Sequence, residues 1–126
     1  MKTSMTKGGL RFSAKLLFQF RIENSGVSNI MRLCEERIIL VSAKSGRGAL
    51  AAAKRRGRSS EHSYSNDSGG TVHFEFVGVL DLLHLGVECE DDEVWYGISQ
   101  RKLPKERASK ILPRESSLSA IRTLGR

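Results

Sequence analysis

The chain has 126 residues, of which 39% are apolar, 28% charged and 6% aromatic. This length suits a single domain with one modest hydrophobic core. The longest apolar runs are far too short to span a bilayer, and the N-terminal residues lack the apolar region of a secretory signal. These features favour a cytoplasmic protein and argue against a membrane protein.

The formal net charge of +7 is concentrated towards the C-terminus. Residues 10–100 carry 11 basic and 12 acidic side chains, whereas residues 101–126 carry eight basic and two acidic ones. Within the nearly neutral body, residues 44–58 hold only basic charges and residues 88–93 only acidic ones. Such segregation is typical of proteins that associate with partners or with a second copy of themselves.

The two cysteines indicate a reducing compartment. Cys34 and Cys89 each lie beside glutamates, which disfavour the thiolate, and neither belongs to a metal-ligand spacing. We therefore expect free and unreactive thiols, no structural metal and a cytosolic protein.

The first half of the chain predicts two strands and a helix. Residues 1–10 are typical of a disordered lead-in, and residues 12–22 alternate between apolar and polar as a half-buried strand does. Turn residues follow through Asn29, and a second strand is expected over residues 35–43. Its centre, Ile38–Val41, is apolar on both faces, which predicts an inner strand. A helix is expected over residues 45–57, capped by Ser45 and ended by Gly57.

The second half predicts two more strands. Residues 58–70 are polar and irregular, whereas residues 71–85 alternate again. One face of that strand is expected to hold Val72, Phe74, Phe76, Leu80 and Leu82, and the other His73, Glu75 and Asp81. Gly78 indicates a bulge or a close approach of the helix. A short last strand is expected over residues 94–98, after an acidic hairpin tip.

Together these elements predict an α+β domain of the order β-β-α-β-β. We expect a four-stranded, mainly antiparallel sheet over residues 11–100, with one principal helix on one face. Residues 101–126 are expected to form a basic tail that is flexible or partly helical, because the apolar positions at Ile111, Leu112, Leu118, Ile121 and Leu124 are few.

Four segments of the chain resemble an uncharacterised family of small bacterial domains, a domain of unknown function. The resemblance covers roughly residues 11–98 and is carried by Phe12–Phe18, Cys34–Leu40, Glu61–Asn66 and Phe74–Asp81. It implies a compact bacterial domain of this β-β-α-β-β kind, and it implies no established activity and no catalytic residues.

Residues 61–66 contain the cluster of side chains that most suggests a catalytic or ligand-binding site. Glu61, His62 and Tyr64 could supply a general base, an acid and an orienting group for a hydrolase or a small-ligand site. Neighbouring residues do not converge by themselves, however, and loop anchoring through His62, Tyr64 and Asn66 explains them as well. The spacing of the histidines and carboxylates predicts no metal site, and no nucleotide-binding loop or other cofactor motif is present.

Basic residues give a nucleic-acid alternative. The candidates at the end of the helix and in the tail are Lys54, Arg55, Arg56, Arg58, Arg101, Lys102, Lys105, Arg107 and Lys110. Phosphate binding by these residues would depend steeply on salt. At the helix end, favourable interaction with the helix dipole explains the same charges.

These observations favour a non-enzymatic protein-interaction module, an accessory or antagonist of another protein. The expectation rests on the neutral body, its segregated charges and its strand edges, which recruit partners or a second copy. Nucleic-acid binding and the ligand or hydrolase site at Glu61, His62 and Tyr64 are the alternatives.

Overall fold

The computed structural model describes residues 9–23, 30–90 and 92–124. Most of the expected lead-in, residues 1–8, and the expected turn over residues 24–29 lie outside the described residues. The chain divides into two units, residues 1–96 and 97–126, which are treated separately below. No helix in the described ranges is long and apolar enough to cross a membrane.

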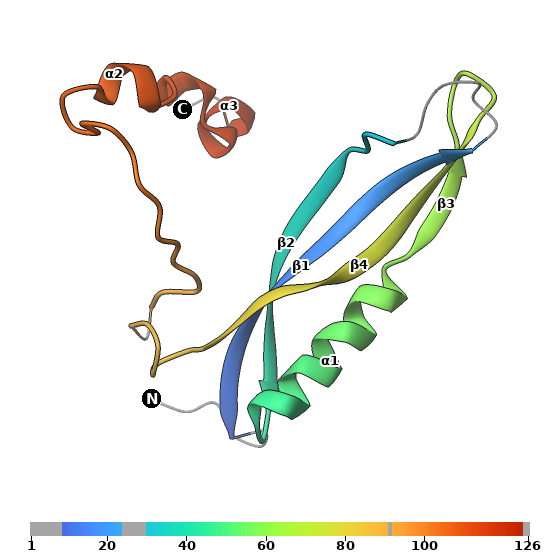
Figure 1. Ribbon diagram of the computed structural model, residues 1–126, viewed down its shortest axis with the longest axis horizontal. Helices are drawn as coiled ribbons and strands as arrows, with labels where there is room; N and C mark the ends of the chain where they lie inside the picture. Colours follow the sequence, from blue (N-terminus) through green and yellow to red (C-terminus); the bar gives the residue numbers. More distant parts are fainter. Residues whose placement is uncertain (1–8, 24–29, 91, 125–126) are drawn as a thin grey trace. The chain divides into compact units, whose positions relative to one another are not determined.

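The first unit is a four-stranded antiparallel sheet with one long helix, as Figure 1 shows. The strand order is β2-β1-β4-β3, so the two 14-residue strands lie in the centre. Its elements are β1 (Leu10–Glu23), β2 (Cys34–Ala43), α1 (Gly46–Ser59), β3 (His62–Ser65) and β4 (Thr71–His84). The predicted α+β class and the order β-β-α-β-β are confirmed.

The hydrophobic core lies between β1, β4 and α1. Alternation along β1 directs Ala14, Leu16 and Phe18 to the face that α1 covers, and all three are buried together with Phe74 and Ala53. The rings of Phe18 and Phe74 stack with centroids 4.6 Å apart. We call this side of the sheet the helix-side face and the opposite side the open face.

The α1 helix begins and packs through small residues. The Ser45 hydroxyl accepts a hydrogen bond from the Gly48 N–H (3.0 Å), which confirms the predicted cap. Ala49, Ala53 and Gly57 are buried at four-residue spacing. Gly57 was expected just after the helix, but α1 continues to Ser59. A Cβ at Gly57 would lie 2.4 Å from the Phe76 ring, so the residue permits close packing rather than ending the helix.

The fourth strand is not where the alternation of residues 94–98 predicted it. Those residues are irregular, and the described residues of the acidic run, 88–90 and 92–93, belong to no strand hairpin. The strand is instead β3, in the segment expected to be a loop. A tight turn closes the β3–β4 hairpin, with Gly69 at φ 84° and the Asn66 N–H bonded to the Gly70 carbonyl (2.9 Å). Because β1 and β3 occupy both edges of β4, residues 94–98 have no free edge of that strand to join.

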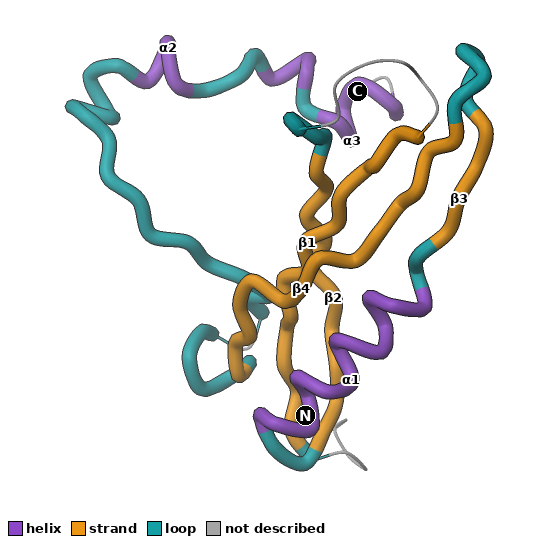
Figure 2. The backbone as a smooth tube through the Cα atoms, turned by 45° about the vertical axis from the view of Figure 1, so that its right-hand side comes forward, coloured by secondary structure: helices purple, strands orange, loops and turns teal. Residues whose placement is uncertain are grey.

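The second strand lies at an edge of the sheet, which corrects the prediction of an inner strand. Ile38 and Leu40 alternate onto the open face, where 45% and 57% of their surface is exposed. Apolar residues on both faces therefore do not mark an inner strand here. Figure 2 shows β2 beside β1 along the twisted sheet.

Two irregularities interrupt the pairing of β4 with β1. The register shifts between Leu17 and Phe18 and again between Lys15 and Leu16, next to Gly78 and its neighbours. Of the two alternatives predicted for Gly78, irregular pairing is found beside it, and a close approach of the helix is not, since nothing lies within 4 Å of a Cβ built at this position. The shifts also break the expected alternation, so Leu80 is half exposed (49%) instead of sharing the buried position of Phe74.

The second unit contains short helical segments only. They are α2 (Ala108–Ile111), the 3₁₀ turn η1 (Glu115–Ser117) and α3 (Ser119–Leu124). The partly helical form of the predicted tail is confirmed. Leu103, Leu112 and Leu118 are exposed, which agrees with the sparse apolar positions in its sequence.

Candidate functional site

The open face of the sheet carries a hydrogen-bonded polar network. Register places Gln19 opposite Glu75 and Arg21 opposite His73, so their side chains share that face. One Glu75 oxygen accepts from Gln19 Nε2 (2.9 Å) and Arg21 Nε (3.0 Å), and the other accepts from Arg21 Nη2 (2.8 Å). The bonds from Arg21, followed by the bond from Gln19, lower the pKa of Glu75 to about 2. Glu75 is therefore ionised at all physiological pH values.

A second chain of contacts joins three strands on the same face. The Ser63 hydroxyl lies 2.6 Å from His73 Nδ1, and His73 Nε2 contacts a carboxylate oxygen of Glu23. The bond to His73 is also the main reason that the pKa of Glu23 is lowered. A hydroxyl, an imidazole and a carboxylate are thus linked by successive contacts, and the residues at both ends, Ser63 and Glu23, are exposed.

The hairpin geometry explains why Ser63 and His73 meet. The Asn66 N–H bonds to the Gly70 carbonyl, so Asn66 and Gly70 form a hydrogen-bonded pair at the end of the hairpin. Hydrogen-bonded pairs recur at every second position along an antiparallel hairpin, and the next one is therefore Tyr64 with Val72. Ser63 and His73 form a pair between these, and the side chains of such pairs lie closest together. The same alternation directs the Ser63 N–H away from β4, towards the outer edge of β3.

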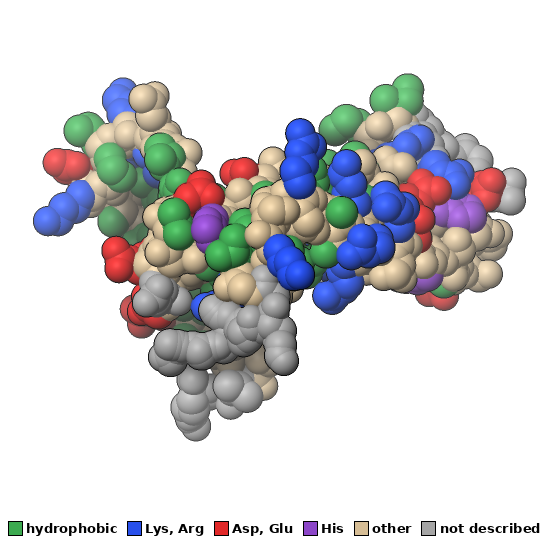
Figure 3. Space-filling view, turned by 90° about the horizontal axis from the view of Figure 1, so that it is seen from below, with side chains coloured by type: hydrophobic (Ala, Val, Ile, Leu, Met, Phe, Trp, Pro, Cys, Tyr) green, Lys and Arg blue, Asp and Glu red, His purple; other side chains and the backbone are tan. Residues whose placement is uncertain are grey.

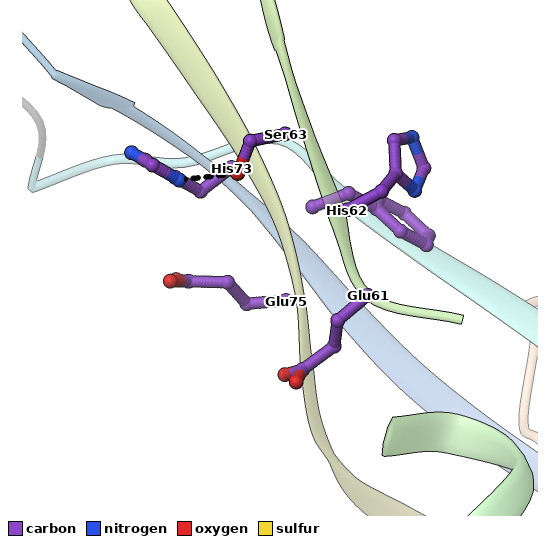
Figure 4. Close-up of a pocket in the computed structure, with 6 residues that line it drawn as sticks. Glu61, His62, Ser63, His73 and Glu75 are labelled. Atoms are coloured by element: carbon purple, nitrogen blue, oxygen red, sulfur yellow. Dashed lines mark hydrogen bonds between the residues drawn. The ribbon is translucent and has the colours of Figure 1, made fainter. Parts of the chain in front are cut away.

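A shallow surface pocket of about 310 Å³ adjoins this chain of contacts. It is lined by Glu61, His62, Ser63, His73, Phe74 and Glu75. In Figure 4 the carboxylates of Glu61 and Glu75 point to one side of the strands, while the His62 ring turns to the other.

The three residues singled out from the sequence do not converge. Glu61 accepts a hydrogen bond from the Phe76 N–H (2.9 Å), and His62 Nδ1 lies 3.1 Å from the Ser60 carbonyl. Tyr64 is 46% exposed, with its ring 6.0 Å from that of His62. Asn66 accepts hydrogen bonds from the backbone of Ser68 and Gly70, as expected of a loop anchor. Each of these contacts stabilises the conformation of the chain between α1 and β4.

All the charges on the outer face of α1 are basic. The helix contains five basic residues and no acidic one, and Figure 3 shows Lys and Arg side chains gathered along it. Arg47, Lys54, Arg55 and Arg58 lie opposite the buried stripe, and Arg56 is exposed at its margin. None of them forms an ion pair with a described residue. The remaining candidates, Arg101, Lys102, Lys105, Arg107 and Lys110, are exposed in the second unit.

The free edge of β2 is a feature that sequence reasoning missed. The Phe20 N–H bonds to the Leu33 carbonyl (2.9 Å), so in this register the odd-numbered residues of β2 direct their N–H groups to β1. The N–H groups of Glu36, Ile38, Leu40 and Ser42 therefore point outward. No strand in the described part of the chain pairs with them.

The Ser63, His73 and Glu23 contacts were missed as well. The sequence placed His73 on the polar face of its strand, but the contact with Glu23 joins residues 50 positions apart. The described residues hold no group of three metal-binding side chains, and Cys34 and Cys89 are free thiols.

The fold and these surfaces define a small α+β domain with one helix-covered and one open sheet face. Residues 11–94 match the family described as a domain of unknown function (DUF4288), and the chain belongs to that family. No curated protein and no solved structure matches the chain significantly.

Proposed function

We propose that this domain is a protein-interaction module that binds an extended segment of a partner along the outer edge of β2. The observation that carries the proposal is that the same residues offer outward N–H groups and exposed apolar side chains. Edge strands of this kind accept an additional strand from another protein, and natural proteins otherwise block them with charge, proline or a covering element.

The exposed side chains define which segment would fit. Ile38 and Leu40 lie on the open face beside Lys15 and Ser13, and both are about half exposed. A partner strand with apolar residues at alternate positions would cover them while its backbone pairs with the edge. Glu36 lies two residues before Ile38 and already forms an ion pair with Lys15 (3.4 Å), so the partner needs no charged residue at that end.

We further propose that this binding takes place in the cytoplasm. The two free thiols support a reducing compartment, because cysteines of secreted small domains are usually paired.

The test is affinity capture with the full-length chain and two strand variants, with and without nuclease. Ile38→Lys/Leu40→Lys places charge on the binding edge, and Val77→Lys is the control, because it adds a charge at an exposed apolar position of the central strand β4, away from the free edge of β2. We expect a stoichiometric protein partner that survives nuclease, is lost in the double variant and is retained by Val77→Lys. Retention by the double variant, with its melting temperature unchanged, would overturn the proposal.

A second candidate, nucleic-acid binding, is favoured by the basic outer face of α1. The outer face of α1 presents four cations over 12 residues, and the helix contains no carboxylate. The phosphates of a nucleic acid can neutralise such a row of positive charges. The basic tail would add to this attraction. We expect Arg55→Gln/Arg58→Gln to reduce the slope of log affinity against log salt by about 1.4 for a single-stranded oligonucleotide. An unchanged slope would exclude α1 from the interface.

A further inference from the structure

We propose that Ser63 is an activated nucleophile, with His73 as its general base and Glu23 as a positioning residue, in a site that cleaves small carboxylic esters. This activity goes beyond the proposed binding at β2 and lies on the other edge strand of the sheet. The two proposals use different residues and therefore stand or fall separately.

The contacts allow the arrangement of protons that a serine nucleophile requires. When the imidazole of His73 is neutral and Glu23 is a carboxylate, the proton lies on Nε2, which donates to Glu23. His73 Nδ1 then accepts a hydrogen bond from the Ser63 hydroxyl across 2.6 Å. This is the relation of nucleophile, base and orienting group that activates serine in unrelated folds.

Other charged groups around His73 are compatible with this role. Glu75 follows two residues along β4 and is held by Arg21, which in turn lies opposite His73. Arg21 forms an ion pair with Glu75 (2.8 Å), and its Nη1 also lies 4.0 Å from the Glu23 Oε2 that does not contact His73. Glu23 therefore remains the carboxylate in direct contact with the imidazole.

Ser63 is accessible to a substrate, and its own backbone N–H is free to donate a hydrogen bond to that substrate. The residue is exposed on a short edge strand, and no strand in the described ranges pairs with the outer edge of β3. Its N–H points towards that edge, as derived above from the hairpin register. A backbone N–H beside the nucleophile can donate to the negative oxygen that develops when a carbonyl is attacked.

The adjoining pocket indicates the class of substrate. Its volume of about 310 Å³ suits a small molecule. The carboxylates of Glu61 and Glu75 both line it, which disfavours anionic substrates. We therefore assign small neutral or cationic esters.

The reaction balances with water as the only co-reactant. Ser63 Oγ attacks the ester carbonyl carbon while its proton passes to His73 Nδ1, and the Glu23 carboxylate stabilises the imidazolium through Nε2–H. The bond from carbonyl carbon to alkoxide oxygen breaks, and the alcohol leaves with the proton from Nδ1. Water, deprotonated by the same nitrogen, then hydrolyses the acyl-serine and releases the carboxylic acid.

The first test is labelling of the full-length protein with a fluorophosphonate probe. Ser63 Oγ bonds to phosphorus, fluoride leaves, and the hydroxyl proton passes through His73 to solvent. We expect one label per chain, located at Ser63 by peptide mass spectrometry. Ser65→Ala, which removes another exposed serine of β3, should label like the wild type, and Ser63→Ala should not label. Labelling spread over several serines, or none at Ser63, would overturn the proposal.

Two further variants test the supporting residues. We expect His73→Gln to slow labelling at least 100-fold, and Glu23→Gln to slow it about 10-fold, with Glu23→Asp recovering part of the loss. Melting temperatures identify any variant that has lost its fold. Rates unaffected by His73→Gln in a folded protein would exclude general-base activation.

A hydrolysis assay tests the substrate class. We expect turnover of 4-nitrophenyl acetate that depends on Ser63, and slower turnover of the anionic 4-nitrophenyl hemisuccinate. Equal turnover by Ser63→Ala would show that the ester is hydrolysed elsewhere and would overturn the assignment.

Discussion

The two faces of the sheet differ in what their side chains do. The helix-side face is closed by aromatic and small residues, with Phe18 fully buried and Phe74 only 1% exposed. The open face carries polar side chains that are hydrogen-bonded to one another and apolar side chains that are exposed to solvent. The exception is the end of this face around Ser13 and Leu83, where both residues are buried and the Lys15 ammonium lies 5.6 Å from the centroid of the Trp95 ring. The comparison indicates that one face stabilises the fold and the other is available for binding and chemistry.

The largest effect expected from this comparison is in the core. Phe18→Ala should lower the free energy of unfolding by about 3–5 kcal/mol, because it leaves a cavity beside Phe74. Leu40→Ala on the open face should cost no more than about 0.5–1 kcal/mol, because the side chain is already half exposed. Urea denaturation measures both. Equal losses would show that the open face is part of the core.

The next effect concerns the contact of α1 with the sheet. Gly57→Ala should destabilise the protein by about 1–2 kcal/mol, because the new methyl group would overlap the Phe76 ring. The energetic cost of this overlap exceeds the stability that alanine gains over glycine through its higher helix propensity. Gly46→Ala is the control, since nothing lies within 4 Å of its added Cβ. Thermal unfolding compares the two. Stabilisation by Gly57→Ala would mean that α1 does not pack so closely.

A smaller, pH-dependent effect is expected on the open face. Glu75→Gln should cost about 1 kcal/mol at pH 7, since the charge-assisted bonds to Arg21 are partly exposed. The folded-state pKa of about 2 lies below the ordinary value of 4.5, so this stability is fully present above pH 4.5 and is lost as pH falls towards 2.

Denaturation of both proteins between pH 7 and pH 2.5 checks this dependence. Glu90→Gln is the control, because its carboxylate has no hydrogen bond or ion pair with a described residue. A difference between Glu75→Gln and wild type that stays constant down to pH 2.5 would contradict the role of the Arg21 pair.

The smallest effect is expected on the outer face of α1. Arg58→Ala should change the free energy of unfolding by less than about 0.5 kcal/mol, because the side chain is exposed and forms no ion pair with a described residue. A loss above 1 kcal/mol would show that the basic face stabilises the helix, and would weaken its interpretation as a binding surface.

The sequence predicted the fold better than the site, for physical reasons. Alternation in β1 and β4 and the cap at Ser45 are local signals, and they correctly placed the main elements. The β3 strand escaped notice because all four of its side chains are exposed and carry no apolar alternation. Val94–Ile98 was expected to be a strand, but β1 and β3 already pair with both edges of β4, the strand that precedes it in the chain.

The site depended on pairings that local sequence does not encode. Ile38–Val41 was expected inside the sheet, and only the strand order shows that its outer edge is free. Likewise, Ser63 meets His73 through the hairpin register, and His73 meets Glu23 across the sheet. The sequence singled out Glu61, His62 and Tyr64 in this segment, but the residue there that contacts the His73 imidazole is Ser63.

The most direct test of the free edge of β2 is residue-resolved amide hydrogen exchange in the isolated full-length protein. The N–H groups of Arg37, Ile39 and Val41 point to β1 and should exchange slowly. Those of Ile38, Leu40 and Ser42 point outward and should exchange quickly, which gives an alternating pattern along one strand. Uniform protection of all six would show that this edge is already paired, and would contradict its availability to a partner.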